Sequence, residues 1–230
     1  MRASAIQSNL MFGNPDPYGA NVAPLLHFYG NNGDTTTTDS SRSGLTVNFY
    51  GGSTITTAQS KFGGSSLNVP LTTNARVSTA NVAPQQFTGP ITIEFWLYLS
   101  ATTASQYVVA SNYVVGGGHA WFYLPSTGRI ACYLFGSDSA TSAITAGAWH
   151  HIAAGFDGTK KYFFVDGSLV QAIAATPLFQ AAPQGWSVGG TEASISASIG
   201  GCAVDDFRVT YGVCRYTAAF PVPTSPFPNP

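Results

Sequence analysis

Residues 91–99, ITIEFWLYL, alternate between two sets of side chains along the whole segment. One set is entirely apolar and consists of Ile91, Ile93, Phe95, Leu97 and Leu99. The other set is mixed and consists of Thr92, Glu94, Trp96 and Tyr98. Successive side chains of a β-strand point to opposite faces of its sheet, so this alternation predicts a strand. Because the mixed face also contains two aromatic rings, we expect this strand near the centre of a sheet.

A second segment, KKYFFVDGSLVQAI at 160–173, predicts a hairpin. Asp166-Gly167 separates two apolar runs and can supply the two positive φ angles of a type I′ turn, giving strands at 160–165 and 168–173. Similar short runs, separated by clusters of Gly, Asn, Ser and Thr, predict further strands near 25–29, 45–49, 53–57, 65–69, 75–79, 107–113, 119–124, 129–135, 149–156, 186–189 and 202–210. Since no segment keeps a helical period, the fold class is all-β, with antiparallel sheets.

The composition favours one large core and excludes several kinds of partner. The 230 residues are 44% hydrophobic and 13% aromatic, enough to fill the space between two sheets of one domain. Only 8% are charged and the net charge is -1, so no basic stripe is available to neutralise nucleic-acid phosphates. No run of 18 apolar residues predicts a membrane span, and the first residues lack the apolar segment of a secretory signal.

The two ends differ from the body of the chain. Residues 1–22 contain Asn14-Pro15-Asp16-Pro17 and no periodic pattern, which predicts an extended N-terminal arm before a sandwich at 23–230. Five prolines between 221 and 230 cannot donate to a sheet, so this end is expected to cross the surface as a strap. Cys132, Cys202 and Cys214 are expected to be free thiols, with a Cys202–Cys214 bridge as the less favoured alternative.

Several segments together resemble the concanavalin A-like lectin/glucanase superfamily, in particular the laminin-G-like domains of bacteriophage structural proteins. They are DPYGANVAPLLHFYGNNGDTTTTDSS (16–41), AQSKFGGSSLNV (58–69), ITIEFWLYL (91–99), GAWHHIAAGFDGTKKYFFVDG (147–167) and VDDFRVTYGVCRYTAAFPVPTSPFP (204–228). The resemblance implies a jelly-roll sandwich of two antiparallel sheets in a virion protein made in the host cytoplasm. Tyr29 stands where the family usually has an acidic residue, which puts any role of that acid in doubt here.

Catalysis is not expected. Glucanases of this fold use two Glu residues flanking the glycosidic bond, one as nucleophile and one as acid, usually in the cluster E-x-D-x-x-E. The only two glutamates, Glu94 and Glu192, lie far apart and outside any such cluster. A glycoside hydrolase with another carboxylate arrangement is the least favoured reading of the function.

Two sets of candidate binding residues remain. Aromatic rings stack on the flat faces of sugars, and polar side chains bind sugar hydroxyls. The candidate glycan-binding residues are Tyr113, His119, Trp121, Tyr123, Asp138 and Trp186, of which we expect a large part to face the core. The candidate calcium ligands are Asp34, Asp39 and Asp206, although Asp206 is more simply explained by an ion pair with Arg208 on the same strand face.

The sequence therefore predicts a non-enzymatic virion structural protein displayed on the particle exterior, as a capsid decoration (cement) or a tail or fibre module. Its expected partners are other virion proteins and copies of itself, with no nucleic acid and no membrane insertion. The alternative is a carbohydrate-binding adhesin that recognises host surface glycans, and both roles are compatible. We expect no cofactor except a possible calcium ion.

Overall fold

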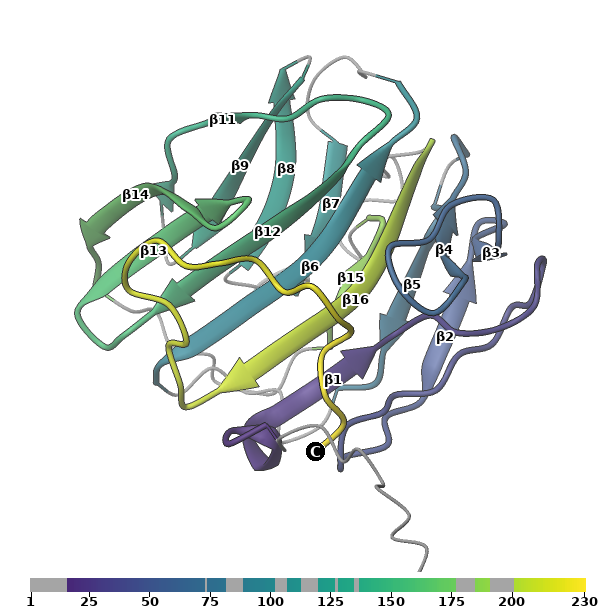
Figure 1. Cartoon of the computed structure of the whole chain (residues 1–230), viewed down its shortest axis with the longest axis horizontal. Helices are drawn as coiled ribbons and strands as arrows, with labels where there is room; N and C mark the ends of the chain where they lie inside the picture. The colour runs from purple at the N-terminus through teal and green to yellow at the C-terminus, as the bar shows by residue number, and fades with distance from the viewer. Residues whose placement is uncertain are drawn as a thin grey trace, which may run out of the picture.

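The computed structural model describes residues 16–72, 74–81, 89–101, 107–112, 120–126, 128–134, 137–176, 185–190 and 201–230. Two antiparallel sheets pack face to face, with strand β6 crossing the middle of the molecule (Figure 1). The described residues include one short 3-10 turn, η1 (Gly19–Asn21), and no helix that is long and apolar enough to cross a membrane. This arrangement confirms the predicted all-β sandwich.

The first sheet, called sheet A, has the strand order β14-β13-β12-β6-β16-β4-β3, and β1 pairs with β16. Its strands are β1 (Val22–Leu26), β3 (Thr54–Thr56), β4 (Ser66–Val69), β6 (Ile91–Leu99), β12 (Trp149–Phe156), β13 (Lys160–Val165), β14 (Ser168–Ala174) and β16 (Cys202–Tyr211). The predicted strand at 91–99 is confirmed with its bounds, and β12 and β16 flank it on both sides.

The second sheet, called sheet B, has the order β10-β9-β8-β7-β15-β5-β2, and β11 pairs with β9. Its strands are β2 (Val47–Tyr50), β5 (Arg76–Thr79), β7 (Tyr107–Ser111), β8 (Ala120–Ser126), β9 (Arg129–Leu134), β10 (Ser137–Asp138), β11 (Ser142–Ala143) and β15 (Ser187–Val188). The two-residue strands β10 and β11 were not predicted, because two residues are too few to show an alternating pattern.

The predicted hairpin of β13 and β14 is confirmed at its turn. Asp166 and Gly167 have φ angles of 50° and 72°, as a type I′ turn requires. The core lies between the sheets, where Phe95 of β6 packs edge-on against Phe122 of β8 with ring centroids 5.0 Å apart. The other inward residues of β6, Ile91, Ile93, Leu97 and Leu99, belong to the same buried cluster.

The C-terminal strap, residues 212–230, covers the outer face of sheet A. In Figure 1 its yellow trace crosses in front of β12, β6 and β16 and ends near β1. Phe220 and Tyr216 pack against a patch around Phe164 of β13, and Phe227 packs against Val22 and Leu25 of β1. The strap therefore covers Thr92 and Glu94 on the mixed face of β6, which a two-layer sandwich would leave in water.

Part of the predicted N-terminal arm also lies on the body of its own chain. Asp16 accepts hydrogen bonds from Arg215 of the strap at 2.6 and 3.0 Å, and η1 follows it. Residues 1–15 lie outside the described residues.

All three cysteines are free, so the less favoured Cys202–Cys214 bridge is not formed. Cys202 points into the core between the sheets, whereas Cys214, in the strap, packs on the opposite face of sheet A. Sheet A thus separates the two sulfur atoms.

Candidate functional site

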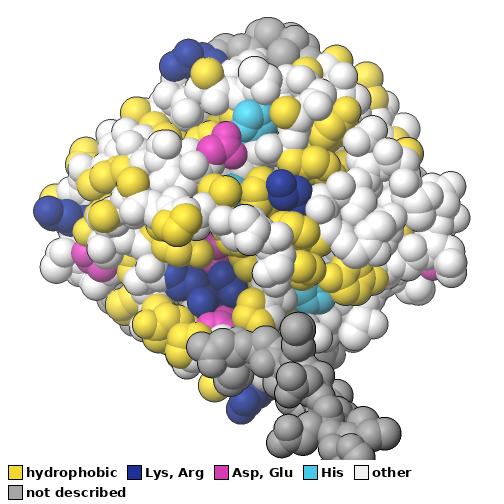
Figure 2. Space-filling model, viewed as in Figure 1, with side chains coloured by type: hydrophobic (Ala, Val, Ile, Leu, Met, Phe, Trp, Pro, Cys, Tyr) yellow, Lys and Arg dark blue, Asp and Glu magenta, His cyan; other side chains and the backbone are white. Residues whose placement is uncertain are grey.

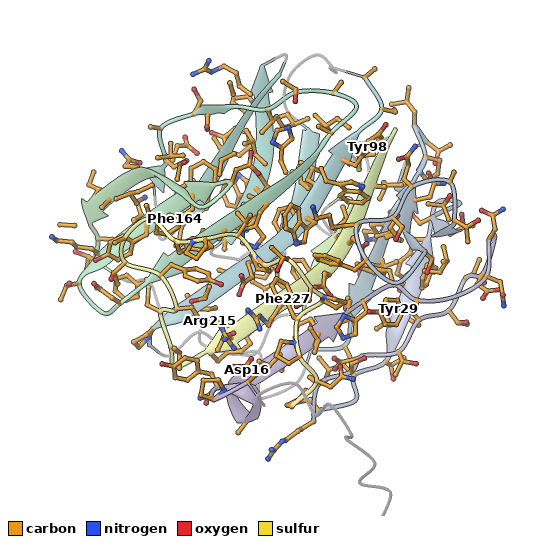
Figure 3. The ribbon with its side chains drawn as sticks, in the orientation of Figure 1. Asp16, Tyr29, Tyr98, Phe164, Arg215 and Phe227 are labelled. Carbon is orange, nitrogen blue, oxygen red and sulfur yellow. The ribbon has the colours of Figure 1, made fainter. Side chains whose placement is uncertain are left out.

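The strap-covered face of sheet A contains a buried network of charged side chains. Arg208 donates to Glu94 at 2.7 and 3.0 Å and to Asp16 at 3.2 Å. The hydroxyl of Tyr216, on the strap, donates to the other oxygen of Glu94 at 3.0 Å. Figure 3 shows Asp16 and Arg215 close together at one end of the strap, and Figure 2 shows charged side chains clustered among hydrophobic ones on this face.

The network keeps Glu94 ionised and closed to solvent. Burial alone would raise its pKa, but the charge and hydrogen bonds of Arg208, together with His151, whose Nε2 lies 3.3 Å from the carboxylate, lower the pKa to about 2. A carboxylate that is fully buried and bound to arginine is not placed to protonate or attack a glycosidic bond. Glu94 therefore ties β6 to β16 and to the strap.

A β-bulge in β16 corrects the predicted pair of Asp206 and Arg208. The register shifts between Asp205 and Arg208, and Asp206 has a φ of 52°. Asp206 contacts the imidazole of His27 and accepts the backbone N–H of Phe227 at 2.7 Å, which fastens the strap. Arg208 pairs with Glu94 and Asp16, so the predicted Asp206–Arg208 pair was wrong.

The predicted calcium ligands do not come together. Asp34 accepts the N–H of Asn31, and Asp39 accepts those of Leu25, Ser41 and Leu45. Within the described ranges, no three acidic, histidine or cysteine side chains are grouped as a metal site would need. Asp34, Asp39 and Asp206 instead fix loops and the strap, and a calcium site built from these three residues was a wrong prediction.

Asp205 makes the stability of this face depend on pH. Burial and the nearby charge of Asp206 raise its pKa to about 7, although the N–H groups of Phe62 and Lys61, at 3.0 and 2.8 Å, oppose the shift. The folded state therefore keeps a proton that the unfolded chain releases above 3.8, so this group lowers stability progressively as pH rises from 3.8 to about 7.

We expect Asp205→Asn to become more stable relative to the wild-type protein as pH rises through this interval. Asparagine keeps an oxygen for the two N–H groups but does not ionise. Thermal unfolding midpoints of both proteins over a pH series measure the effect. Parallel profiles for the two proteins would show that Asp205 ionises in the folded state as it does in the unfolded chain.

The outer face of sheet B bears a cluster of aromatic side chains, called here the aromatic face: Trp121 and Tyr123 of β8, Tyr133 of β9 and Asp138 of β10. Trp121 lies opposite Tyr133, and Tyr133 lies opposite Asp138, so cross-strand pairing brings them together. The rings of Trp121 and Tyr133 are stacked, 3.8 Å apart and within 4° of parallel. All three rings are half-buried, while Asp138 is exposed.

Asp138 orients the neighbouring tyrosine. Its carboxylate accepts a hydrogen bond from the Tyr123 hydroxyl, and burial together with this bond raises the pKa of Tyr123. The aromatic face thus combines flat carbon surfaces with a fixed hydroxyl and a carboxylate acceptor. This set of groups suits a ligand with apolar C–H faces and many hydroxyls.

The structure divides the predicted glycan-binding residues into three groups. Trp121, Tyr123 and Asp138 come together on the aromatic face. Tyr113 and His119 lie outside the described residues. Trp186 is fully buried, donates from its indole N–H to the Tyr211 hydroxyl at 3.0 Å, and belongs to the core, so its assignment to a sugar site was wrong.

Tyr133 is the residue of the aromatic face that sequence reasoning missed. It shares a strand side with Arg129 and Ala131 in the alternating segment RIACYL at 129–134, whose other side is buried. That alternation was visible in the sequence, but it does not reveal that Trp121 of another strand would lie directly opposite.

The comparisons with known proteins agree with the architecture. Residues 71–214 match the family described as the concanavalin A-like lectin/glucanases superfamily. Similar solved structures include the binding domain of Paraclostridial Mosquitocidal Protein 1, with 11% identity and a TM-score of 0.65 over 86% of this chain and 50% of that chain. The botulinum neurotoxin type G receptor binding domain has 14% identity and a TM-score of 0.61, over 83% of this chain and 47% of that one.

A third similar structure is the botulinum neurotoxin serotype D ligand binding domain in complex with N-acetylneuraminic acid, with 10% identity and a TM-score of 0.62 over 90% of this chain and 49% of that chain. The chain thus spans about half the length of these structures, and identities this low establish a shared fold alone. No curated protein sequence matches significantly. Because the family match extends over more than half of its residues, the chain belongs to the concanavalin A-like lectin/glucanases superfamily.

Proposed function

We propose that this protein is a non-catalytic carbohydrate-binding domain and that the aromatic face of sheet B is its binding site. The main observation is the stack of Trp121 on Tyr133 beside the Tyr123–Asp138 hydrogen bond. Sugar rings present C–H faces to aromatic rings, and their hydroxyls donate to carboxylates. The structural neighbours described as receptor or ligand binding domains, one of them with N-acetylneuraminic acid, support a binding role.

A non-catalytic role fits the placement of the carboxylates. The retaining mechanism needs two carboxyl groups about 5 Å apart across the scissile bond. Asp138 is the single carboxylate of the aromatic face, and Glu94 is held by Arg208 in the other sheet. We therefore propose that a bound glycan is held and released without cleavage.

Glycan-array binding tests the site. We expect Tyr133→Ala and Trp121→Ala each to weaken binding of the best glycan about tenfold, as the loss of one stacking surface worth about 1.4 kcal/mol implies. Tyr50→Ala is the matched control, since Tyr50 is an exposed aromatic residue of β2 at the other edge of sheet B. An array without any binding, or equal losses in all three variants, would contradict the proposal.

We further propose that the domain is displayed on the exterior of a bacteriophage particle, as a capsid decoration or as a tail or fibre module. Support comes from the resemblance of residues 204–228 to phage structural proteins and from a surface with few charges, which allows close packing of copies. Other virion proteins and copies of this chain would be its neighbours there, and host surface glycans its ligands.

Antibodies against the purified protein test the display. We expect immunogold labelling of intact particles at a regular position. Unlabelled intact particles, combined with labelling after disruption, would place the protein inside and contradict the proposal.

A role of the first residues in assembly is tested by removing residues 1–15 alone. Removal through residue 22 would also delete Asp16, an ion-pair partner of Arg208 and Arg215. We expect the shortened chain to remain folded and to attach less well to particles than the wild-type protein does. Equal attachment of the two proteins would contradict a role of these residues in assembly.

A further inference from the structure

A groove lies on the outer face of sheet A, on a part of the sheet that the strap does not line. Its volume is about 170 Å³, and its lining includes Thr56, Gln59, Asn68, Tyr98, Ser100 and Ala203. Figure 3 shows Tyr98 toward the end of β6 that lies away from Phe227 and the strap. The groove belongs to β3, β4, β6 and β16 and the loops beside them, so the sandwich separates it from the aromatic face.

The groove exists because a small residue lies between larger ones in one row across the sheet. Ala203 of β16 pairs with Asn68 of β4 on one side and with Tyr98 of β6 on the other. The next residue in this row is Trp149 of β12, whose ring lies 5.5 Å from that of Tyr98. The methyl group of Ala203 therefore forms the floor of the groove. The Asn68 side chain borders it on one side and the Tyr98 ring on the other.

The described lining combines apolar surface with several polar side chains, none of them charged. It offers the side-chain amides of Asn68 and Gln59 and the hydroxyl of Tyr98, for which the described part of the chain provides no hydrogen-bond partner. Ser66 fixes the position of Gln59 by donating to its backbone carbonyl at 2.7 Å. Two amides and a phenol around an aromatic wall can both donate to and accept from ligand hydroxyls.

We propose that this groove is a second saccharide site, which binds one uncharged hexose ring against Tyr98. No charged side chain is among the described residues of its lining, which favours a neutral sugar over a sialic or uronic acid, whose carboxylate would lose its water without gaining a cation. The volume is below the range of about 300–1,000 Å³ of pockets that enclose a whole ligand, so one ring of a longer glycan fits there. This site is additional to the aromatic face and does not depend on it.

Nuclear magnetic resonance titration of the intact, isotope-labelled protein tests the proposal. The probes are the methyl glycosides of glucose, galactose and mannose, with glucuronate as the charged comparison. We expect at least one neutral glycoside, at millimolar concentration, to shift the backbone amides of Asn68, Gly201 and Ala203. No response to any neutral probe, or a stronger response to glucuronate, would overturn the proposal.

Two variants locate the response. Ala203→Leu fills the floor and is expected to weaken binding at least tenfold, whereas Ala174→Leu, the same change on exposed β14, leaves it unchanged. Asn68→Ala removes an amide that supports no other described residue, so the fold is kept and binding is expected to fall several-fold. Wild-type binding in both groove variants would overturn the proposal. Trp121→Ala, which tests the aromatic face, is expected to leave the groove response intact, so failures of the two sites are distinguishable.

Discussion

Arg208→Met is expected to lower the free energy of unfolding by about 3–5 kcal/mol, the cost of breaking a buried ion pair by removing one partner. Arg208 is 4% exposed and donates to Glu94 and to Asp16. Methionine fills much of the same space but leaves Glu94 buried without its main counter-charge. Urea unfolding at neutral pH measures the loss.

The pH dependence of this loss identifies its cause. In the wild-type protein the pKa of Glu94 is lowered from 4.5 to about 2, so the stabilisation is present above 4.5 and disappears as pH falls through about 2. The difference between Arg208→Met and the wild type should therefore shrink below pH 4.5. Arg129→Met is the control, because Arg129 is exposed and bonds only to Thr141 among the described residues, and we expect a change within about 0.5 kcal/mol. Equal effects of the two variants would contradict the role of the network.

Trp186→Ala is expected to cost about 3–5 kcal/mol of stability while leaving the glycan affinity of the folded protein unchanged. The indole is fully buried, its ring lies 5.6 Å from that of Phe207, and its N–H is bound to Tyr211. Alanine would leave a cavity between the sheets and remove the indole N–H that binds the Tyr211 hydroxyl.

Trp121→Ala should show the reverse pattern, with a small loss of stability and a clear loss of binding, because its ring is half-buried at the surface. Chemical unfolding and glycan binding, measured on both variants below their unfolding midpoints, separate the two roles. A loss of affinity in folded Trp186→Ala equal to that in Trp121→Ala would contradict the assignment of Trp186 to the core.

The strands could be predicted because their signal is local. The alternation at 91–99 and the turn at Asp166-Gly167 depend on neighbouring residues, and both elements lie where they were expected. The first strand was expected at 25–29 and lies at Val22–Leu26, since the apolar run alone did not show where its pairing with β16 begins.

The site was harder to predict because it depends on contacts between distant segments. An alternating pattern cannot reveal the bulge at Asp206, which separates it from Arg208 and joins it to His27. It also cannot rank aromatic residues by exposure: Trp121 lies on a surface strand pair, whereas Trp186 lies in the core.

The strap explains why the two outer faces of the sandwich differ. Bound through Tyr216, Phe220 and Phe227, it covers part of the outer face of sheet A, around Glu94, Phe164 and β1. The charged residues that the strap covers thereby serve stability. The binding function is proposed for the stacked rings on the other sheet and for the groove that the strap does not line.

The most direct test of the carbohydrate-binding proposal is a crystal structure of the intact protein with the glycan that binds best on an array. We expect a sugar ring in contact with Trp121 and Tyr133, with a hydroxyl bound to Asp138. A glycan bound elsewhere on the protein, with the aromatic face unchanged and unoccupied, would contradict it.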